Sequence, residues 1–437
     1  MTTPVPPETT PSAHPGDAPD VLVVGGGIGG LATAFALARQ GVAVRVLERA
    51  KEFGEVGAGI QLAPNCTRIL EEFGLLDEAK ARGCVPKALV MKDALDGEEL
   101  TRIDLGALER RYGTPYLVIH RSDLHRLFLD ACRAAGVDLR TDAAVTGYEN
   151  TPGGARVTLA DGTRQEAGLV VAADGLHSVA REHFVGDDVV DSRYVAYRAA
   201  VPREELPGKA LALDSVVVHV GPHCHFVQYP LRGGEMLNQV AVFASPGALA
   251  GAEEFGTPEE LDAAFAGTCD AVRDGIPLMW RDRRWPMRDR EPVETWVHGR
   301  VALLGDAAHP PLQYMAQGAI MAIEDGWVLG QHLDRLRTAD GAPDWDAALV
   351  AYEAVRVEHC RRVLTTARAW GALWHLEGTE RLRRNAILRA RAHDDWSFTD
   401  WIYGPTALTP DEEAAMFTPI PLDSADLART EPEAAAR

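Results

Sequence analysis

Glycines and an acidic residue with the spacing of a phosphate and sugar site stand near the start of the chain. The apolar run Val21–Val24 leads into GGGIGG, where Gly25, Gly27 and Gly30 match G-x-G-x-x-G. These glycines allow a tight turn, a close approach to a pyrophosphate, and close packing of a helix whose N-terminus faces the anion. Glu48 follows at roughly the 20-residue spacing of an acid that binds ribose hydroxyls. The pattern predicts a dinucleotide site, whereas a tight turn without a ligand would explain only Gly25.

Two more acidic residues end apolar strands further along the chain. Asp174, followed by Gly175, ends the apolar run in LVVAADGLHSVAR, and Asp306 ends the run in RVALLGDAAHP. Ligands of open α/β sheets bind outside the carboxyl ends of the strands. Together with Glu48, these ends predict one long ligand that is contacted at several places. Because the chain has a single G-x-G-x-x-G, the pattern favours FAD over NAD.

The apolar periodicity predicts the elements that position these residues. Residues 29–40 have the pattern of a helix, and 42–48 that of a strand. Residues 116–136 are predicted to form a strand and then a helix with Ser122 as its N-cap.

The order of elements predicts an α/β protein with a Rossmann-like dinucleotide-binding domain, an inserted β-sheet substrate domain and C-terminal helices. The predicted limits are 19–85, 115–190 and 290–345 for the first domain, 86–114 and 191–289 for the second, and 346–405 for the helices. The Pro/Thr-rich residues 1–18 are predicted to be a disordered lead-in and 423–437 a loose tail.

Composition excludes several classes of function. The 437 residues carry a net charge of −20, which argues against nucleic acid or an anionic membrane as partner. The six cysteines are scattered without a C-x-x-C, so neither a metal site nor a disulfide framework is predicted. There is no apolar run of about 20 residues and no signal-peptide pattern, so we expect a cytoplasmic protein with reduced thiols.

Three motifs are specific enough to identify a family. GGGIGG with Glu48, DGLHSVAR (174–181) and GDAAHPPLQYMAQGAIMAIEDG (305–326) resemble the signatures of the single-component flavin aromatic hydroxylases, the family of para-hydroxybenzoate hydroxylase and salicylate hydroxylase. Within it, five segments are similar to the 3-hydroxybenzoate 6-hydroxylases: GEVGAGIQ (54–61), PYLVIHRSDLH (115–125), HCHFVQYPLRGGEMLNQVAVF (223–243), RWPMRDREPVETWVHGRVALLGDAAHPPLQY (284–314) and ALWHLEGTERLRRN (372–385). The resemblance covers nearly the whole chain except the two tails.

This resemblance implies a fold like that of para-hydroxybenzoate hydroxylase, with non-covalent FAD. It implies hydroxylation of 3-hydroxybenzoate to gentisate with O₂ and NADH (NADPH is not excluded) through a flavin C4a-hydroperoxide. It also suggests a homodimer and leaves an internal lipid open. Salicylate 1-hydroxylase or 6-hydroxynicotinate 3-monooxygenase activity would share the same FAD motifs. Further alternatives are a flavoprotein dehydrogenase or oxidase that inserts no oxygen, and a non-catalytic binder of FAD.

The resemblance also implies roles for individual cofactor residues. Asp306 would bind a ribityl hydroxyl and could at the same time be a helix N-cap, and Arg121 would reach the FAD phosphates or ribityl chain. Gly318 and Ala319 would begin a helix whose N-terminus faces the flavin. Arg181 belongs to the second signature, which has a joint role in FAD and nicotinamide binding. The predicted cofactor residues are Gly25, Gly27, Gly30, Glu48, Arg49, Gly59, Arg121, Asp174, Gly175, Asp306, Gly318 and Ala319.

The predicted catalytic residues are His225, Gln313 and Tyr229, and Tyr116 joins them in the predicted substrate site. His225 and Tyr229 are four apart in a predicted strand and share a face, in an alternation that includes His223. The family resemblance implies that His225 accepts a phenol proton and that Gln313 orients the substrate. Without the resemblance, a hydrogen-bonded core role would be favoured for His225. The two tyrosines would pack on the ring or hydrogen-bond the carboxylate, or could equally be core residues.

Four further aromatic or histidine positions are assigned no chemistry. His309, in GDAAHP, is predicted to lie near the flavin without an acid–base role. Trp370 and Trp374, together with His375, are predicted to pack in the core or at a dimer interface.

Overall fold

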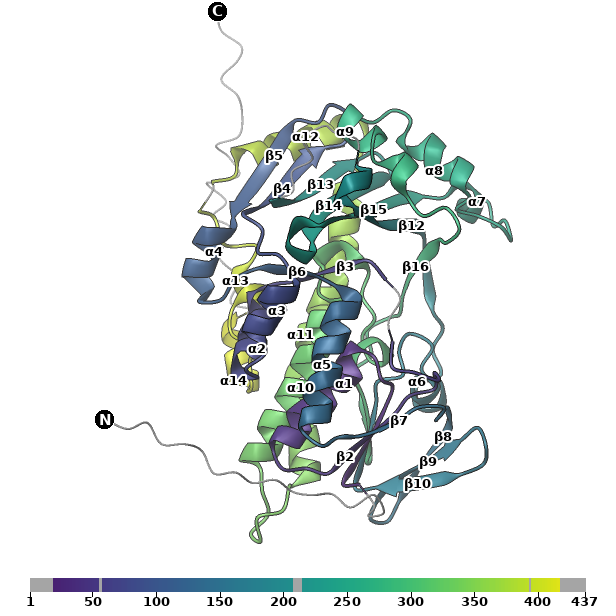
Figure 1. Cartoon of the computed structure of the whole chain (residues 1–437), viewed down its shortest axis with the longest axis vertical. Helices are drawn as coiled ribbons and strands as arrows, with labels where there is room; N and C mark the ends of the chain where they lie inside the picture. Colours follow the sequence, from purple (N-terminus) through teal and green to yellow (C-terminus); the bar gives the residue numbers. More distant parts are fainter. Residues whose placement is uncertain (1–18, 55–56, 207–213, 393, 417–437) are drawn as a thin grey trace, which may run out of the picture.

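The computed structural model describes residues 19–54, 57–206, 214–392 and 394–416. The predicted lead-in 1–18 and tail 423–437 lie outside the described residues. Two large sheets stand at opposite ends of the molecule, and the helices α10 (Gly318–Arg335) and α11 (Trp345–Trp374) run between them (Figure 1).

The first large sheet has six strands in the order β17-β18-β11-β1-β2-β7, all parallel except β17. Both faces of its central strands are buried, which explains why β1 and β11 are continuously apolar. The strands are β1 (Val21–Val24), β2 (Val44–Leu47), β7 (Asp138–Arg140), β11 (Leu169–Ala172), β17 (Val297–His298) and β18 (Val301–Leu303).

Small residues let two helices approach each other against this sheet. A Cβ on Gly326 of α10 would lie 2.6 Å from Thr33 Oγ1 of α1 (Ile28–Arg39). The helix α5 (Arg121–Ala134) packs beside α1. The predicted N-cap Ser122 is wrong: α5 begins two residues earlier, and the cap is His120, whose Nδ1 accepts a hydrogen bond from the Ser122 backbone N–H at 3.3 Å.

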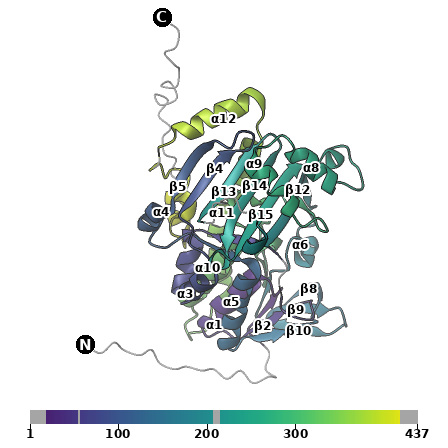
Figure 2. The same cartoon turned by 45° about the horizontal axis from the view of Figure 1, so that its top comes forward.

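The second large sheet has seven strands in the order β16-β12-β15-β14-β13-β4-β5 (Figure 2). They are β4 (Ala88–Asp93), β5 (Glu99–Asp104), β12 (Val190–Pro202), β13 (Ser215–Gly221), β14 (Cys224–Leu231), β15 (Met236–Ala244) and β16 (Trp285–Asp289). One face is covered by α8 (Pro258–Phe265) and α9 (Asp270–Arg273), where Phe226 and Phe243 pack on Phe265. Because side chains alternate along β14, His225 and Tyr229 point to the opposite face.

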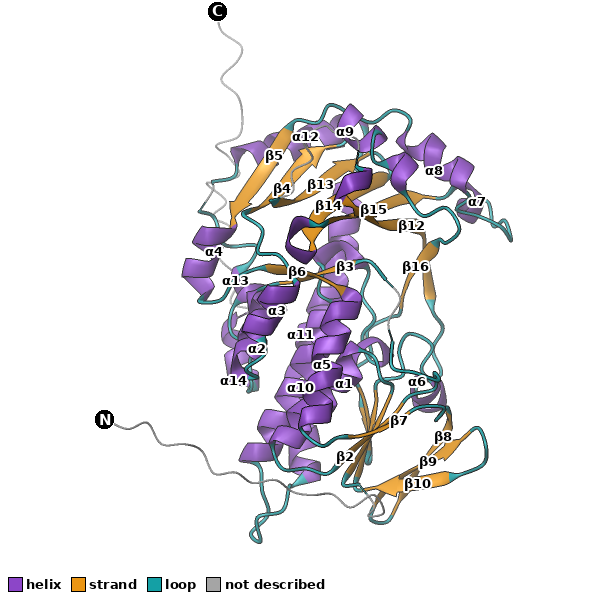
Figure 3. Cartoon of the chain, viewed as in Figure 1, coloured by secondary structure: helices purple, strands orange, loops and turns teal. Residues whose placement is uncertain are grey.

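Smaller elements complete the structure (Figure 3). An antiparallel sheet contains β8 (Val145–Thr151), β9 (Gly154–Leu159) and β10 (Arg164–Ala167), and β3 (Gly59–Leu62) pairs with β6 (Leu117–His120). The other helices are α2 (Pro64–Glu72), α3 (Leu76–Arg82), α4 (Leu105–Tyr112), α6 (Val179–Phe184), α7 (Pro246–Leu249), α12 (Gly378–Ala390), α13 (Asp400–Tyr403) and α14 (Pro410–Met416). The 3₁₀ turns are η1 (Arg203–Glu205), η2 (Arg232–Gly234), η3 (Ile276–Leu278), η4 (Gly305–Ala307) and η5 (Gln313–Met315).

The predicted fold class is confirmed: a mostly parallel α/β sheet is combined with a second β-sheet and with helices late in the chain. The residue limits of the domains stay a prediction. Across the described ranges, none of the helices combines the length and apolar character needed to span a membrane.

Candidate active site

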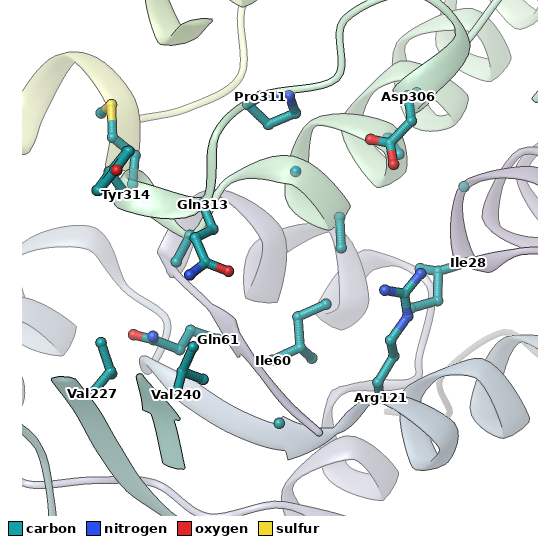
Figure 4. A pocket seen from close by; sticks show the side chains of 18 of the residues that line it. Ile28, Ile60, Gln61, Arg121, Val227, Val240, Asp306, Pro311, Gln313 and Tyr314 are labelled. Atoms are coloured by element: carbon teal, nitrogen blue, oxygen red, sulfur yellow. The ribbon is translucent and has the colours of Figure 1, made fainter. Parts of the chain in front are cut away.

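One cavity of about 1260 Å³ lies between the two large sheets and brings all the predicted cofactor and substrate residues together. The residues come from segments as distant in sequence as Gly25 and Ala319. We call this space the central cavity. In Figure 4, Gln313 and Ile60 point into it from opposite sides, and Arg121 extends toward Ile28 at the start of α1.

The glycine-rich turn is packed too tightly for side chains. Gly25 has φ +109°, and a Cβ there would lie 2.2 Å from the carbonyl oxygen of Ala173. A Cβ on Gly30 would lie 2.0 Å from the Gly25 carbonyl oxygen. The helix α1 begins directly after Gly27 with no acidic residue in its first turn and no side-chain cap among the described residues. Its backbone N–H groups are therefore placed to bind an anion such as a pyrophosphate.

The carboxylate of Glu48 is fixed beside this turn. Its Oε2 accepts a hydrogen bond from the Gly26 N–H at 2.7 Å, and its Oε1 accepts one from the Ala50 N–H at 2.8 Å. On the other side, the buried His125 has its Nε2 at 2.8 Å from the Gly26 carbonyl oxygen. The carboxylate lines the central cavity at the end of β2, where it suits the hydroxyls of a ribose.

Asp174 offers an unused acceptor to the same cavity. Its Oδ2 accepts hydrogen bonds from the Tyr148 hydroxyl at 3.1 Å and the Val179 N–H at 2.9 Å. Its Oδ1 is buried without a partner among the described residues. A long ligand with hydroxyl or amide donors would satisfy this atom, so the residues present fit FAD.

Asp306 lines the cavity from η4, and its further assignment as a helix N-cap is wrong. The next long helix, α10, begins only at Gly318, after the N-cap Gln317. No side chain in the described ranges caps α10, and its first turn holds no acidic residue. Because Gly318 and Ala319 line the cavity, the positive end of α10 points at any ligand held there.

Arg181 does not line the central cavity, in contrast to its neighbours in the second signature. Its side chain is fully buried and pairs with Asp187 at 2.7 Å. Its guanidinium donates hydrogen bonds to the carbonyl oxygens of Ala307 and Ala308, at 3.2 and 2.5 Å. Arg181 therefore holds the loop that carries Asp306 and has no direct contact with the ligand space.

A second buried network holds the same loop from behind. Asp325 accepts hydrogen bonds from the Gly305 N–H at 3.0 Å and from Arg356 Nε at 2.8 Å, and it pairs with His309 Nε2 at 2.6 Å. Burial favours a neutral carboxyl, but His309 and Arg356 outweigh it and lower the pKa of Asp325 to about 2. His309 is 2% exposed and does not line the cavity. Cys360 lies beside His309 and Asp325. Its Sγ is 3.5 Å from a guanidinium nitrogen of Arg356, so this buried cluster already contains a positive charge.

The substrate end of the cavity is lined by phenols and an amide. Tyr229 reaches it from β14, and the Tyr116 hydroxyl donates a hydrogen bond to Gln61 Oε1 at 2.7 Å. Burial raises the pKa of both tyrosines well above 10, so their hydroxyls stay protonated and can donate. Gln313 enters from η5.

His225 is held by a residue that the sequence assigned to packing. Its Nδ1 lies 2.9 Å from Nε2 of His375, at the C-terminal end of α11, and both rings are buried. Burial and the neighbouring His375 lower the pKa of His225 well below 6.5, which favours a neutral ring. Trp370 and Trp374 pack against a buried cluster that includes Leu312 and Tyr314, as predicted, and both also line the cavity. His223 was wrongly placed in the strand alternation, because it lies in the turn before β14 with φ +55° and is exposed.

Arg198 is a residue of the cavity that sequence reasoning missed. Its guanidinium donates a hydrogen bond to Gln313 Oε1 at 3.2 Å and lies 5.4 Å from the Trp285 ring centroid. It forms no ion pair within the described residues, and its Nε is buried without a partner there. Burial lowers the pKa of Arg198, and the nearby Arg121 adds to the effect. The sequence feature that could have identified Arg198 is that it is the single charged residue in the otherwise apolar stretch 195–201. A lone arginine in such a stretch is typical of an anion-binding group.

The fold and the cavity together define a protein that holds FAD at the carboxyl ends of a parallel sheet. The sequence matches the family described as FAD binding domain over residues 18–367, and the chain belongs to this family. The predictions of the family and of FAD as cofactor are confirmed.

Named relatives cover nearly the whole chain. The 3-hydroxybenzoate 6-hydroxylase of Polaromonas naphthalenivorans (strain CJ2) is 41% identical over 90% of this chain and 97% of its own length. The 3-amino-4-hydroxybenzoate 2-monooxygenase PtnB3 of Streptomyces platensis is 39% identical over 88% of this chain and 96% of its own length. Among solved structures, Klebsiella pneumoniae HpxO complexed with FAD and uric acid has a TM-score of 0.74 and 29% identity, covering 85% of this chain and 93% of that one.

Proposed function

We propose that this protein is an FAD-dependent aromatic monooxygenase that converts 3-hydroxybenzoate into gentisate (2,5-dihydroxybenzoate), with NADH and O₂ as co-substrates. The observation that carries the proposal is the placement of His225. It lines the same cavity as the glycine-rich turn, and its Nδ1 is paired with His375, which leaves Nε2 for a ligand. A buried neutral imidazole in this place suits the removal of a phenol proton.

The carboxylate of the substrate has partners at the same end of the cavity. Arg198 supplies a half-buried positive charge, and the protonated hydroxyl of Tyr229 can donate a hydrogen bond, whereas the Tyr116 hydroxyl already donates to Gln61. Since Gln313 Oε1 accepts from Arg198, its amide nitrogen remains to donate to the substrate. Together with His225, these groups would fix the direction of the aromatic ring.

His225 would act by accepting the phenol proton at Nε2. An ionised phenol pushes electron density onto its para carbon, which is the carbon that becomes hydroxylated in gentisate. Bound FAD, once reduced by NADH, would supply the activated oxygen. Val227 and Val240 line the cavity, and their apolar side chains would pack on the ring and exclude water from it. The positive N-terminus of α10, at Gly318, would stabilise negative charge on the reduced cofactor.

The named relatives indicate a second candidate substrate. The 39% identical relative is a 3-amino-4-hydroxybenzoate 2-monooxygenase, so an aminated hydroxybenzoate is the first alternative substrate to test. Salicylate and 6-hydroxynicotinate are the next alternative substrates to test. The preference for NADH over NADPH is carried over from the resemblance stated above.

We also propose a cytoplasmic homodimer, again from the resemblance. An internal lipid would fit the part of the central cavity that is lined by Met91, Ile103, Ile387, Leu388 and Arg391, because apolar side chains beside one arginine suit an anionic molecule with an apolar tail.

The test is NADH oxidation by the FAD-loaded protein with and without 3-hydroxybenzoate, followed by chromatography of the products under ¹⁸O₂. We expect stimulated oxidation and gentisate that carries one labelled oxygen. Stimulation with only peroxide would make 3-hydroxybenzoate a mimic of another substrate. Gentisate without label, or no stimulation by any of the acids named above, would contradict the proposal.

A further inference from the structure

His225 is in contact with a second buried histidine, His375. His375 does not line the central cavity, yet its Nε2 lies 2.9 Å from His225 Nδ1. Its ring stacks on Tyr194, with centroids 4.5 Å apart and planes at 15°, so it is held in one orientation. We propose that His375 receives the proton that His225 takes from the phenol and passes it toward solvent, so that the two histidines form a proton relay. The proposal rests on the function proposed above.

The contact defines which ring nitrogens carry protons. To accept a phenol proton at Nε2, neutral His225 must carry its own proton on Nδ1. That N–H then donates to His375 Nε2, so neutral His375 carries its proton on Nδ1. When the phenol O–H bond breaks, the electron pair stays on the oxygen and the proton binds His225 Nε2. The His225 Nδ1 proton can then move to His375 Nε2, and His375 releases its Nδ1 proton, so the charges balance at every step.

The backbone of His375 lies beside an exposed histidine. Its carbonyl oxygen accepts a hydrogen bond from the His223 N–H at 3.2 Å. The His223 side chain is 59% exposed, and its Nε2 lies 3.3 Å from Glu377 Oε2. An exposed histidine and carboxylate therefore stand next to the buried pair, at the point where a proton would leave for solvent.

The groups around His375 favour passing a proton on rather than keeping it. They are Tyr194 from β12, His225 from β14, Tyr314 from η5, Arg384 from α12 and the turn residue His223. Burial, then His223 and Arg384, lower the pKa of His375 to about 3. Among these neighbours, Tyr314 stays neutral because burial raises its pKa. His375 acts through His225 and is therefore a positioning residue in the reaction.

The decisive variant is His375→Gln. A glutamine side chain can accept the His225 N–H and hold that ring, but it cannot carry a proton. The FAD-loaded protein is mixed with 3-hydroxybenzoate, without NADH, in weak buffer with a pH indicator, and proton release is followed by stopped flow. His219→Gln is the matched control, because His219 is buried on the neighbouring strand β13 and does not line the cavity.

We expect His375→Gln to slow proton release at least tenfold without a change in FAD content. The control His219→Gln should release the proton at the wild-type rate. Imidazole should partly restore the rate in His375→Ala. In the wild-type protein, a plot of the proton-release rate against the fraction of D₂O should be curved, as it is when two protons move in one step. A wild-type rate in His375→Gln, a linear isotope plot, or no proton release by the wild-type protein would overturn the relay. Gentisate formation by wild type separately tests the proposed function.

Discussion

Gly59 and Tyr229 lie so close together that a Cβ at residue 59 would be 2.4 Å from Tyr229 Cε2. The Gly59 N–H donates a hydrogen bond to Asn238 Oδ1 at 2.6 Å, so the backbone there cannot easily retreat. The missing side chain lets a strand of the two-stranded sheet press against β14. This contact sets the position of a phenol that lines the substrate end of the cavity.

The substitution Gly59→Ala should therefore move the Tyr229 ring and weaken substrate binding. We expect the KM for 3-hydroxybenzoate to rise roughly tenfold, since off-rotamer side chains and backbone shifts typically cost about 1–3 kcal/mol. FAD content should stay near that of wild type. Gly153→Ala is the control, because a Cβ at this exposed turn meets nothing within 4 Å. An unchanged KM would show that Tyr229 does not contact the substrate.

Glu48 should determine FAD affinity through the shape of the turn as well as through the ribose. Its two oxygens hold the N–H groups of Gly26 and Ala50. Hydrogen bonds to a charged group contribute about 1.5–3 kcal/mol, so we expect Glu48→Ala to weaken FAD binding roughly 10- to 100-fold. Fluorescence titration of the apoprotein measures this, with the exposed Glu52→Ala as control. Equal affinities of the two variants would disprove the assignment.

Arg198 should increase substrate affinity at the expense of stability. It is a half-buried cation without an ion pair inside the described residues, its Nε is buried there without a partner, and burial lowers its pKa. We expect Arg198→Met to raise the melting temperature by a few degrees, because replacing a buried charge with an apolar side chain removes its desolvation cost. The Kd for 3-hydroxybenzoate should rise at least tenfold. A variant that is destabilised and still binds the acid normally would contradict both parts.

The pair formed by His309 and Asp325 should make stability depend on pH above neutrality. Burial by itself lowers the pKa of His309, but the Asp325 carboxylate raises it well above 6.5. The folded chain therefore holds a proton that the unfolded chain loses, so this contribution is complete below about pH 6.5 and falls as pH rises toward the folded pKa. The Asp325 contribution is present above the unfolded pKa and is lost only as pH falls through about 2.

The Asp325→Asn variant tests this. We expect it to lose about 3–5 kcal/mol of stability, because one member of a buried pair is removed. Melting temperatures between pH 6 and 9 should fall less steeply with pH than in wild type. The exposed Asp188→Asn should leave both the melting temperature and its slope unchanged. A parallel decline in Asp325→Asn and wild type would refute the role of this pair.

The motifs that bind FAD could be read from the sequence because their geometry is local. A strand, a glycine turn and a helix determine where Gly25, Gly27 and Gly30 lie, and the next strand places Glu48 beside them. The alternation of β14 likewise determined that His225 and Tyr229 share a face. Such features depend on backbone periodicity within one or two elements, and that periodicity is visible in the order of residues.

The tertiary structure decided which groups meet across long separations. His375 reaches His225 over 150 positions because α11 runs the length of the molecule and ends at β14, and no local pattern encodes that meeting. The Arg181 side chain lies away from the cavity, where it donates hydrogen bonds to the carbonyl oxygens of Ala307 and Ala308. The sequence thus determined the cofactor turn and the class of chemistry through short-range geometry. Burial and charge at the substrate end came from packing, because they depend on every element that closes around the cavity.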